Sequence, residues 1–204
     1  RATSTQPPSV LALVCDSTNV FTEGESGSEA DVRDNLIELV GQQEGRVAIA
    51  AFASNVARLE TAIRAGEANG RRVCLVGRSM HRMTQAAKAV GLLADCQPFI
   101  EEEEIGYFPP DKVLLLCTGS QGEPRAALSR IAEGSHRNVT LNKGDSVIFS
   151  SRIIPGNERG IFDLMNRLAE RGVKIITERD EKIHVSGHPC RDELRQMYAW
   201  AKPR

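Results

Sequence analysis

The chain has 204 residues, of which 41% are hydrophobic, so it is long and apolar enough to form one large domain with a proper core. Its 26 Lys and Arg residues nearly balance its 27 Asp and Glu residues; the net charge gives no indication of a nucleic-acid partner, and any such contact must come from a local patch. No apolar run approaches the length of a membrane span, and the N-terminus lacks the pattern of a signal peptide, so we expect a soluble protein.

The cysteines and the chain ends add two expectations. An odd number of widely spaced cysteines, mostly in apolar segments, predicts free thiols in a reducing compartment such as the cytoplasm, with no disulfide framework and no cysteine-based zinc site. These residues are Cys15, Cys74, Cys96, Cys117 and Cys190. Because the sequence begins without Met and stops at "AKPR", we expect a piece of a longer protein.

Short apolar runs alternate with amphipathic helical patterns along the whole chain. In chain order, they predict a strand at 9–18, a helix at 28–43, a strand at 46–54, a helix at 55–70, a strand at 71–77, a helix at 79–93, an irregular acidic stretch at 96–111, a strand at 112–120, a helix at 124–135, a strand at 146–154, a helix at 157–172, strands at 174–179 and 182–187, and a helix at 190–203. Continuous apolar strands between amphipathic helices favour an α/β, Rossmann-like fold, with a mostly parallel sheet and helices on both faces. In the helix at 157–172 we expect Ile161, Phe162, Met165 and Leu168 to face inward.

The predicted strands end in small hydroxyl, amide or glycine residues. In open parallel sheets, ligands bind beyond the carboxyl ends of the strands, where backbone amides attract anions. We therefore expect a phosphate-binding rim at one sheet edge; alternatively, each turn needs such residues only as caps. The rim candidates are Asp16, Ser54, Asn55, Ser120 and His188.

Two familiar nucleotide motifs are weak here. "CTGSQGEP" lacks the Gly-Lys-Ser or Gly-Lys-Thr of a P-loop, and no Gly-x-Gly-x-x-Gly opens a helix. These absences disfavour P-loop and dinucleotide binding.

The stretch "IHVSGH" places His184 and His188 around Ser186 and Gly187. A strand running into a turn would put His184, Ser186 and His188 on one face, suited to hold a phosphate. A metal site needs three or four ligands, and neither His81 nor His136 has a companion at ligand spacing. Asp16 is either a simple turn former or, if it meets His188, the carboxylate that orients an acid–base imidazole.

Several of these segments together resemble the ribonuclease J family, β-CASP nucleases of the metallo-β-lactamase superfamily. The segments are "VLALVCDSTN", "FASNVARL", "GRSM", "LCTGSQGEPRAALSRIA", "GDSVIFSSRIIPGNE" and "IHVSGH". The resemblance implies a longer zinc-dependent enzyme with two zinc ions, acting on RNA as a 5′-to-3′ exoribonuclease and endoribonuclease. It also implies that Asp16 orients His188 and that His188 sits at the scissile phosphate. The longer enzyme would be a homo-oligomer without a membrane partner.

The family's zinc ligands form a His-x-His-x-Asp-His motif, a further His, a Gly-Asp motif and a late His-Gly-Glu, and none of these occurs here. We therefore expect residues 1–44 to flank a missing metallo-β-lactamase domain, 45–190 to form the β-CASP domain, and 191–204 to return to the missing domain. This chain alone should bind no zinc and cut no RNA.

Two other functions stay open on the residues alone. One is a non-catalytic Rossmann-like module that binds nucleic acid or nucleotide phosphates. The other is a small-molecule nucleotide enzyme that uses the same strand-end rim.

Overall fold

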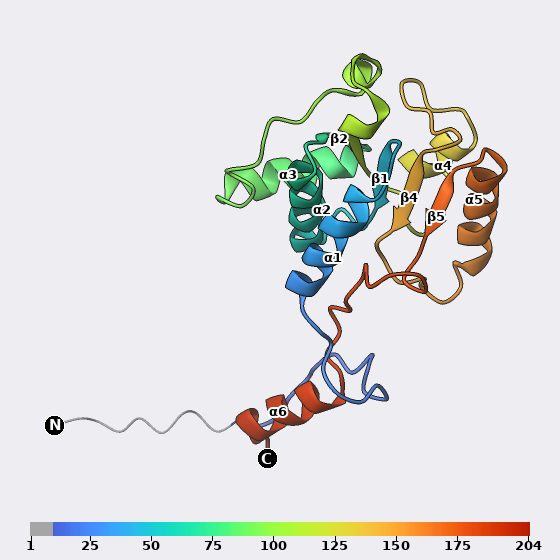
Figure 1. Ribbon diagram of the computed structural model, residues 1–204. Helices are drawn as coiled ribbons and strands as arrows, with labels where there is room; N and C mark the ends of the chain where they lie inside the picture. The colour runs from blue at the N-terminus through green and yellow to red at the C-terminus, as the bar shows by residue number, and fades with distance from the viewer. Residues whose placement is uncertain (1–9) are drawn as a thin grey trace. The chain divides into compact units, whose positions relative to one another are not determined.

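The computed structural model describes residues 10–204 (Figure 1). Its helices are α1 (Glu29–Gly41), α2 (Val56–Ala68), α3 (Arg78–Ala89), α4 (Ala127–Ala132), α5 (Glu158–Glu170) and α6 (Arg191–Ala201), with short 3₁₀ helices η1 (Glu102–Tyr107) and η2 (Pro110–Lys112). Its strands are β1 (Val47–Ala50), β2 (Arg72–Val76), β3 (Val113–Cys117), β4 (Ser146–Phe149) and β5 (Lys174–Ile176). None of the helices within 10–204 is long and apolar enough to cross a membrane.

The described chain folds into two compact units. The sheet unit is Glu29–His184, and the terminal unit joins the described residues up to Ser28 with Val185–Arg204. Helix α1 belongs to the sheet unit, where it packs against α2. The assignment of the flanking segments to a metallo-β-lactamase domain remains a prediction.

The five strands form one all-parallel sheet in the order β2-β3-β1-β4-β5, which confirms the predicted fold class. Parallel pairing brings all the carboxyl ends to the same edge. Because β1 continues to β2 on one side while β4 continues to β5 on the other, the order reverses between β1 and β4. That crevice is where open α/β sheets bind ligands.

Helices cover both faces of this sheet. On one face, Ala48, Leu115 and Val147 share a core with Leu128 and Ile131 of α4. The same core takes in Leu164 and Leu168 of α5. On the other face, α2 lies so close that a side chain on Gly66 would press on Val73 and Leu114. The buried apolar strands predicted from sequence are accordingly the centre of the fold.

Two predicted strands do not form. Residues 10–18 form no strand ladder with the rest of the described chain: their backbone bond to a distant segment runs from the N–H of Arg204 to the carbonyl of Val10 at 3.2 Å, and the bridge of Asn19 to Cys190 lies just beyond them. Leu11 and Val14 are exposed. Residues 182–187 also form no strand, because side chains rather than a neighbouring strand bond to their carbonyls. Nδ2 of Asn35 donates to the carbonyl of Lys182, and Oγ of Ser150 donates to the carbonyl of Ile183.

Two smaller expectations also need correction. Phe162 is 44% exposed, and Leu164 takes the inward place on α5 beside Ile161 and Leu168. The acidic tract is not irregular, because Glu101 and Glu104 form a capping box that starts η1.

Candidate functional site

The strand-end loops of the sheet unit gather at one edge. Ser54 and Asn55 follow β1, and Ser120 follows β3, the neighbouring strand. Asn55 accepts a hydrogen bond from the backbone N–H of Arg58 at 3.1 Å, so its side chain caps α2. Ser54 is exposed. The capping explanation therefore accounts for Asn55, while Ser54 and Ser120 stay predictions for phosphate contact.

Ser120 lies in an unusual environment for a hydroxyl group. It is 2% exposed, and its Oγ has no hydrogen-bond partner among the described residues. It lines a cavity of about 230 Å³ together with Ser151, Phe149 and Arg179. A buried polar atom without a partner is rare in native structures and marks a place where a ligand or water belongs.

Gln121, which sequence reasoning missed, ties the β3 loop to the β4 loop. Its Nε2 donates to the carbonyl of Arg152 at 2.9 Å, and its Oε1 accepts from the N–H of Ile154 at 2.9 Å. The same Oε1 accepts from Asn157 Nδ2 at 3.3 Å. The signal was present in "TGSQGEP", where the glutamine stands between two glycines. The buried amide therefore fixes the shape of this part of the edge.

A buried arginine, also missed, links the helix after β1 to the end of β4. Arg58 on α2 is 1% exposed and forms a bidentate pair with Glu29, Nε to Oε1 at 2.6 Å and Nη2 to Oε2 at 2.9 Å. Its Nη1 donates to the carbonyls of Ser150 and Ile183 at 2.9 and 3.1 Å. Arg58 thus joins α1, α2, the end of β4 and the segment that leads to His184.

His184 is the end of that network. Its Nδ1 lies 3.4 Å from Nη1 of Arg58, which can only donate, so Nδ1 accepts and the proton sits on Nε2. Burial, together with the charges of Arg58 and Arg152, lowers the pKa of His184 to about 4. At neutral pH this imidazole is therefore an uncharged Nε2–H donor.

In the terminal unit, Asp16 and His188 meet. Oδ2 of Asp16 lies at hydrogen-bonding distance from Nδ1 of His188, and both side chains are about half exposed. The backbone N–H of Thr18 donates to Asp16 at 2.8 Å and is the main cause that lowers its pKa to about 2; His188 adds to this. An ionised carboxylate only accepts, so Nδ1 of His188 carries a proton and Nε2 lies on the side of the ring away from Asp16.

The backbone around His188 is held by three side chains of the same unit. Asn19 Nδ2 donates to the carbonyl of His188 and to Oγ of Ser186, both at 3.0 Å. Ser26 Oγ donates to the carboxylate of Glu193, which also caps α6, and lies 3.3 Å from the same carbonyl. The N–H of His188 donates to Ser186 Oγ at 3.2 Å. Ser186 accepts both bonds, so its own proton is free to donate.

The geometry therefore brings together Asp16, Ser186 and His188, and adds Asn19, Ser26 and Glu193 as supports, while the roles expected of Asp16, Ser186, Gly187 and His188 stay predictions. His184 belongs to the other unit and faces Arg58. Across residues 10–204, no three His, Cys, Asp or Glu side chains gather to hold a metal ion. The pair can position a phosphate and donate to its oxygens, whereas two candidate ligands are too few for a zinc site.

Comparisons with known proteins agree on one family. The model of the family "Ribonuclease J, beta-CASP domain" matches residues 44–168, more than half of the chain. Ribonuclease J of Sinorhizobium meliloti is 53% identical over 195 residues, which cover 96% of this chain and 35% of that protein. Ribonuclease J of Corynebacterium glutamicum is 46% identical over 193 residues, covering 94% and 27%. Ribonuclease J of Mycobacterium tuberculosis is 43% identical over 194 residues, covering 94% and 35%.

The chain thus spans about a third of the length of the curated relatives that it matches.

Proposed function

Because this chain belongs to the family of ribonuclease J β-CASP domains, we propose that it is the RNA-binding part of a longer ribonuclease that hydrolyses phosphodiester bonds. The longer enzyme would act as a 5′-to-3′ exoribonuclease and endoribonuclease in RNA processing and decay. It would be a cytoplasmic homo-oligomer; the five free cysteines support a reducing compartment.

The hydrogen bond between Asp16 and His188 is the observation that carries this proposal. Asp16 fixes the imidazole so that Nε2 points away from the carboxylate, where it can give a proton to the leaving oxygen or donate to a phosphate oxygen. The free proton of Ser186 and the backbone amide of Gly187 add donors beside it. His184, uncharged with a proton on Nε2, would donate to RNA from the sheet unit.

Zinc belongs to the proposal for the longer enzyme, with two ions per chain. The residues described here do not supply a ligand set, so the zinc would be held by parts of the enzyme outside this chain. Alone, the chain would bind RNA without cutting it. Every role proposed here for Asp16, Ser186 and His188 concerns proton transfer and phosphate contact.

The test measures single-turnover cleavage of a 5′-monophosphorylated RNA by the longer enzyme with His188→Ala, Asp16→Asn or both. His188→Ala should slow cleavage roughly a hundred- to ten-thousand-fold, which is about 2.7–5.5 kcal/mol of barrier, while RNA affinity changes little. Asp16→Asn should lose part of that factor. The double variant should be little slower than His188→Ala, because the two act as a unit.

The matched control is Asp34→Asn, which removes a carboxylate that is 77% exposed on α1. It should cleave at the wild-type rate, and zinc content should be equal in all variants. Near-wild-type cleavage by His188→Ala, or fully additive losses, would mean that Asp16 and His188 only shape a turn.

A further inference from the structure

A second cavity, of about 920 Å³, opens at the carboxyl ends of β2 and β3. It is lined by five arginines from three segments: the first turns of α3, α4 with the residues just before it, and the loop that follows α4. We call it the arginine cavity, after Arg78, Arg82, Arg125, Arg130 and Arg137.

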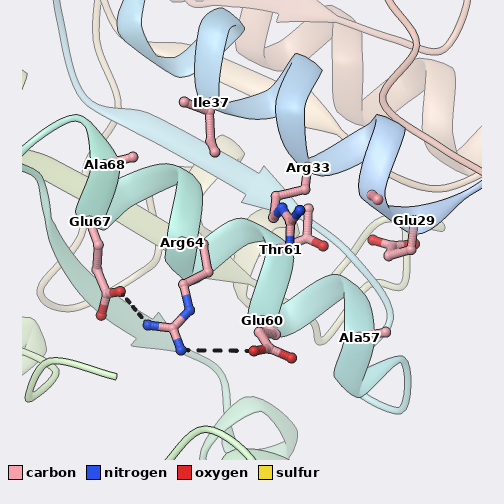
Figure 2. Close-up of a pocket in the computed structure, with 10 residues that line it drawn as sticks. Glu29, Arg33, Ile37, Ala57, Glu60, Thr61, Arg64, Glu67 and Ala68 are labelled. Carbon is pink, nitrogen blue, oxygen red and sulfur yellow. Dashed lines mark hydrogen bonds and ion pairs between the residues drawn. The ribbon is translucent and has the colours of Figure 1, made fainter. Parts of the chain in front are cut away.

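All five guanidinium groups lack partners among residues 10–204. Each residue is exposed, and none of the five side chains makes a hydrogen bond or an ion pair with the residues at 10–204. The cavity between α1 and α2 is a useful contrast (Figure 2). There Arg64 pairs with Glu67 at 3.0 Å and with Glu60 at 3.8 Å, so its charge is neutralised within the protein.

The cavity is strongly cationic within a chain that is almost neutral. Only two carboxylates line it, so five arginines less two glutamates leave three uncompensated positive charges, with its histidines counted as neutral. Glu123 already accepts from the N–H of Gln121 at 3.0 Å, and Glu102 faces His136 at 3.9 Å. Three uncompensated positive charges in one cavity attract an anion.

The backbone of the cavity suits the same kind of ligand. Arg78 is the first residue of α3, whose N-cap, Gly77, has no side chain to satisfy the free N–H groups. Gly77 has φ +115°, and a side chain there would meet Oγ1 of Thr118 at 2.6 Å. Glycine therefore lets the helix start lie against the end of β3, with its amides close to the arginines.

The lining identifies the chemistry of the ligand. Guanidinium groups match phosphate oxygens, and cations spread over three segments suit several phosphates rather than one. The lining holds no Phe, Tyr or Trp, and its aromatic rings are the small imidazoles of His81 and His136, so the cavity offers mainly charge and little surface on which a base can stack. We propose that the arginine cavity binds the sugar–phosphate backbone of single-stranded RNA, independently of its sequence. This inference rests on the proposed function, which supplies RNA as the substrate.

The test uses the intact enzyme that contains this chain, with Arg78→Gln and Arg82→Gln combined. These residues lie one helical turn apart on α3, and glutamine keeps helix propensity. Binding of a 3′-labelled oligouridine of about 20 nucleotides is followed by anisotropy across a salt series. Losing two phosphate contacts should make the slope of log K against log [salt] about 1.4 units shallower. At 0.1 M salt, this corresponds to an affinity loss of about 25-fold.

The matched control is Lys112→Gln combined with Lys143→Gln, which removes the same charge from two exposed lysines just before β3 and β4, at the opposite end of the sheet. It should leave the slope and the affinity unchanged. Equal losses in the two double variants would reduce the effect to net charge and overturn the inference. The inference would also be overturned if a mononucleotide displaced the RNA at the same concentration as the oligonucleotide does, because the cavity should prefer several linked phosphates to one. A wild-type enzyme that binds no RNA would instead refute the proposed function itself.

Discussion

His184 and His188 are four positions apart in the sequence, yet their partners differ in sign. His188 faces the carboxylate of Asp16, whereas His184 faces the guanidinium of Arg58. The sequence pattern predicted that both histidines lie on one phosphate-binding face, because it predicted a strand that runs from His184 into the turn at His188. With no strand in 182–187, side-chain partners decide what each ring can do.

His184 makes the stability of the sheet unit depend on pH. Its pKa falls from 6.5 to about 4 on folding, because burial and Arg58 disfavour the charged ring, so the unfolded chain binds the proton more tightly. The contribution of His184 to the free energy of unfolding is fully present above about pH 6.5 and is lost as the pH falls towards 4. Because the ring is only partly buried, we expect a change on the order of 1 kcal/mol.

Urea unfolding at pH 7.5 and pH 4.5 measures this change, and His184→Gln should reduce the difference between the two pH values. His81→Gln, an exposed histidine on α3, is the control and should keep the wild-type difference. The same pH difference in wild type and His184→Gln would contradict the assignment.

At the scale of elements, the loop after β3 depends on a close approach to α5. Gly122 has φ +70°, and a side chain there would lie 2.5 Å from the carbonyl carbon of Gly160 and 2.7 Å from the N–H of Ile161. These are backbone atoms in the first turn of α5, so they cannot swing aside. Glycine at this position allows Gln121 to join the β3 and β4 loops.

Gly122→Ala should lower the free energy of unfolding by about 2–4 kcal/mol, because it combines a left-handed backbone with a backbone clash. Gly156→Ala is the matched control. It has φ +97° but open space around it, so it should cost only about 1 kcal/mol. Chemical denaturation of the two variants and wild type makes the comparison. Equal losses would show that the contact with α5 adds nothing.

The elements that could be predicted are those whose signal is local. The strands β1 to β5 lie in continuous apolar runs, and the six α-helices within 10–204 overlap the segments whose patterns predicted helices. The run at 9–18 is equally apolar, but a strand forms only when it pairs with another strand, and the sequence of a single segment does not reveal whether such a partner exists. Arg58 could not be predicted either, because its partners lie 29 to 126 positions away and only the fold collects them.

At the scale of the whole molecule, the composition concealed the electrostatics. Lys and Arg balance Asp and Glu over the chain, yet the arginines after β2 and β3 line one cavity and have no partners in the part of the chain that the structure describes. The folded topology, which brings the carboxyl ends of parallel strands together, creates this patch. Asp16 and His188 were foreseen from the family motifs, whereas the arginine cavity has no motif and appeared only with the fold.

The last prediction concerns zinc in the whole chain. A tightly held zinc ion needs three or four protein ligands, and residues 10–204 bring no three suitable side chains together. Residues 1–9 read "RATSTQPPS", which contains no His, Cys, Asp or Glu to complete a set. After incubation with zinc and dialysis, elemental analysis should find well below one zinc per chain.

The longer enzyme, treated identically, is the positive control and should retain about two zinc ions per chain. Alanine at His188 in this chain should change nothing, because Asp16 and His188 supply only two candidate ligands. One or more zinc ions held stoichiometrically by the 204-residue chain, and lost with His188→Ala, would assign these two residues to a metal site. Their hydrogen bond would then be a feature of the metal-free form rather than the arrangement that acts on a phosphate.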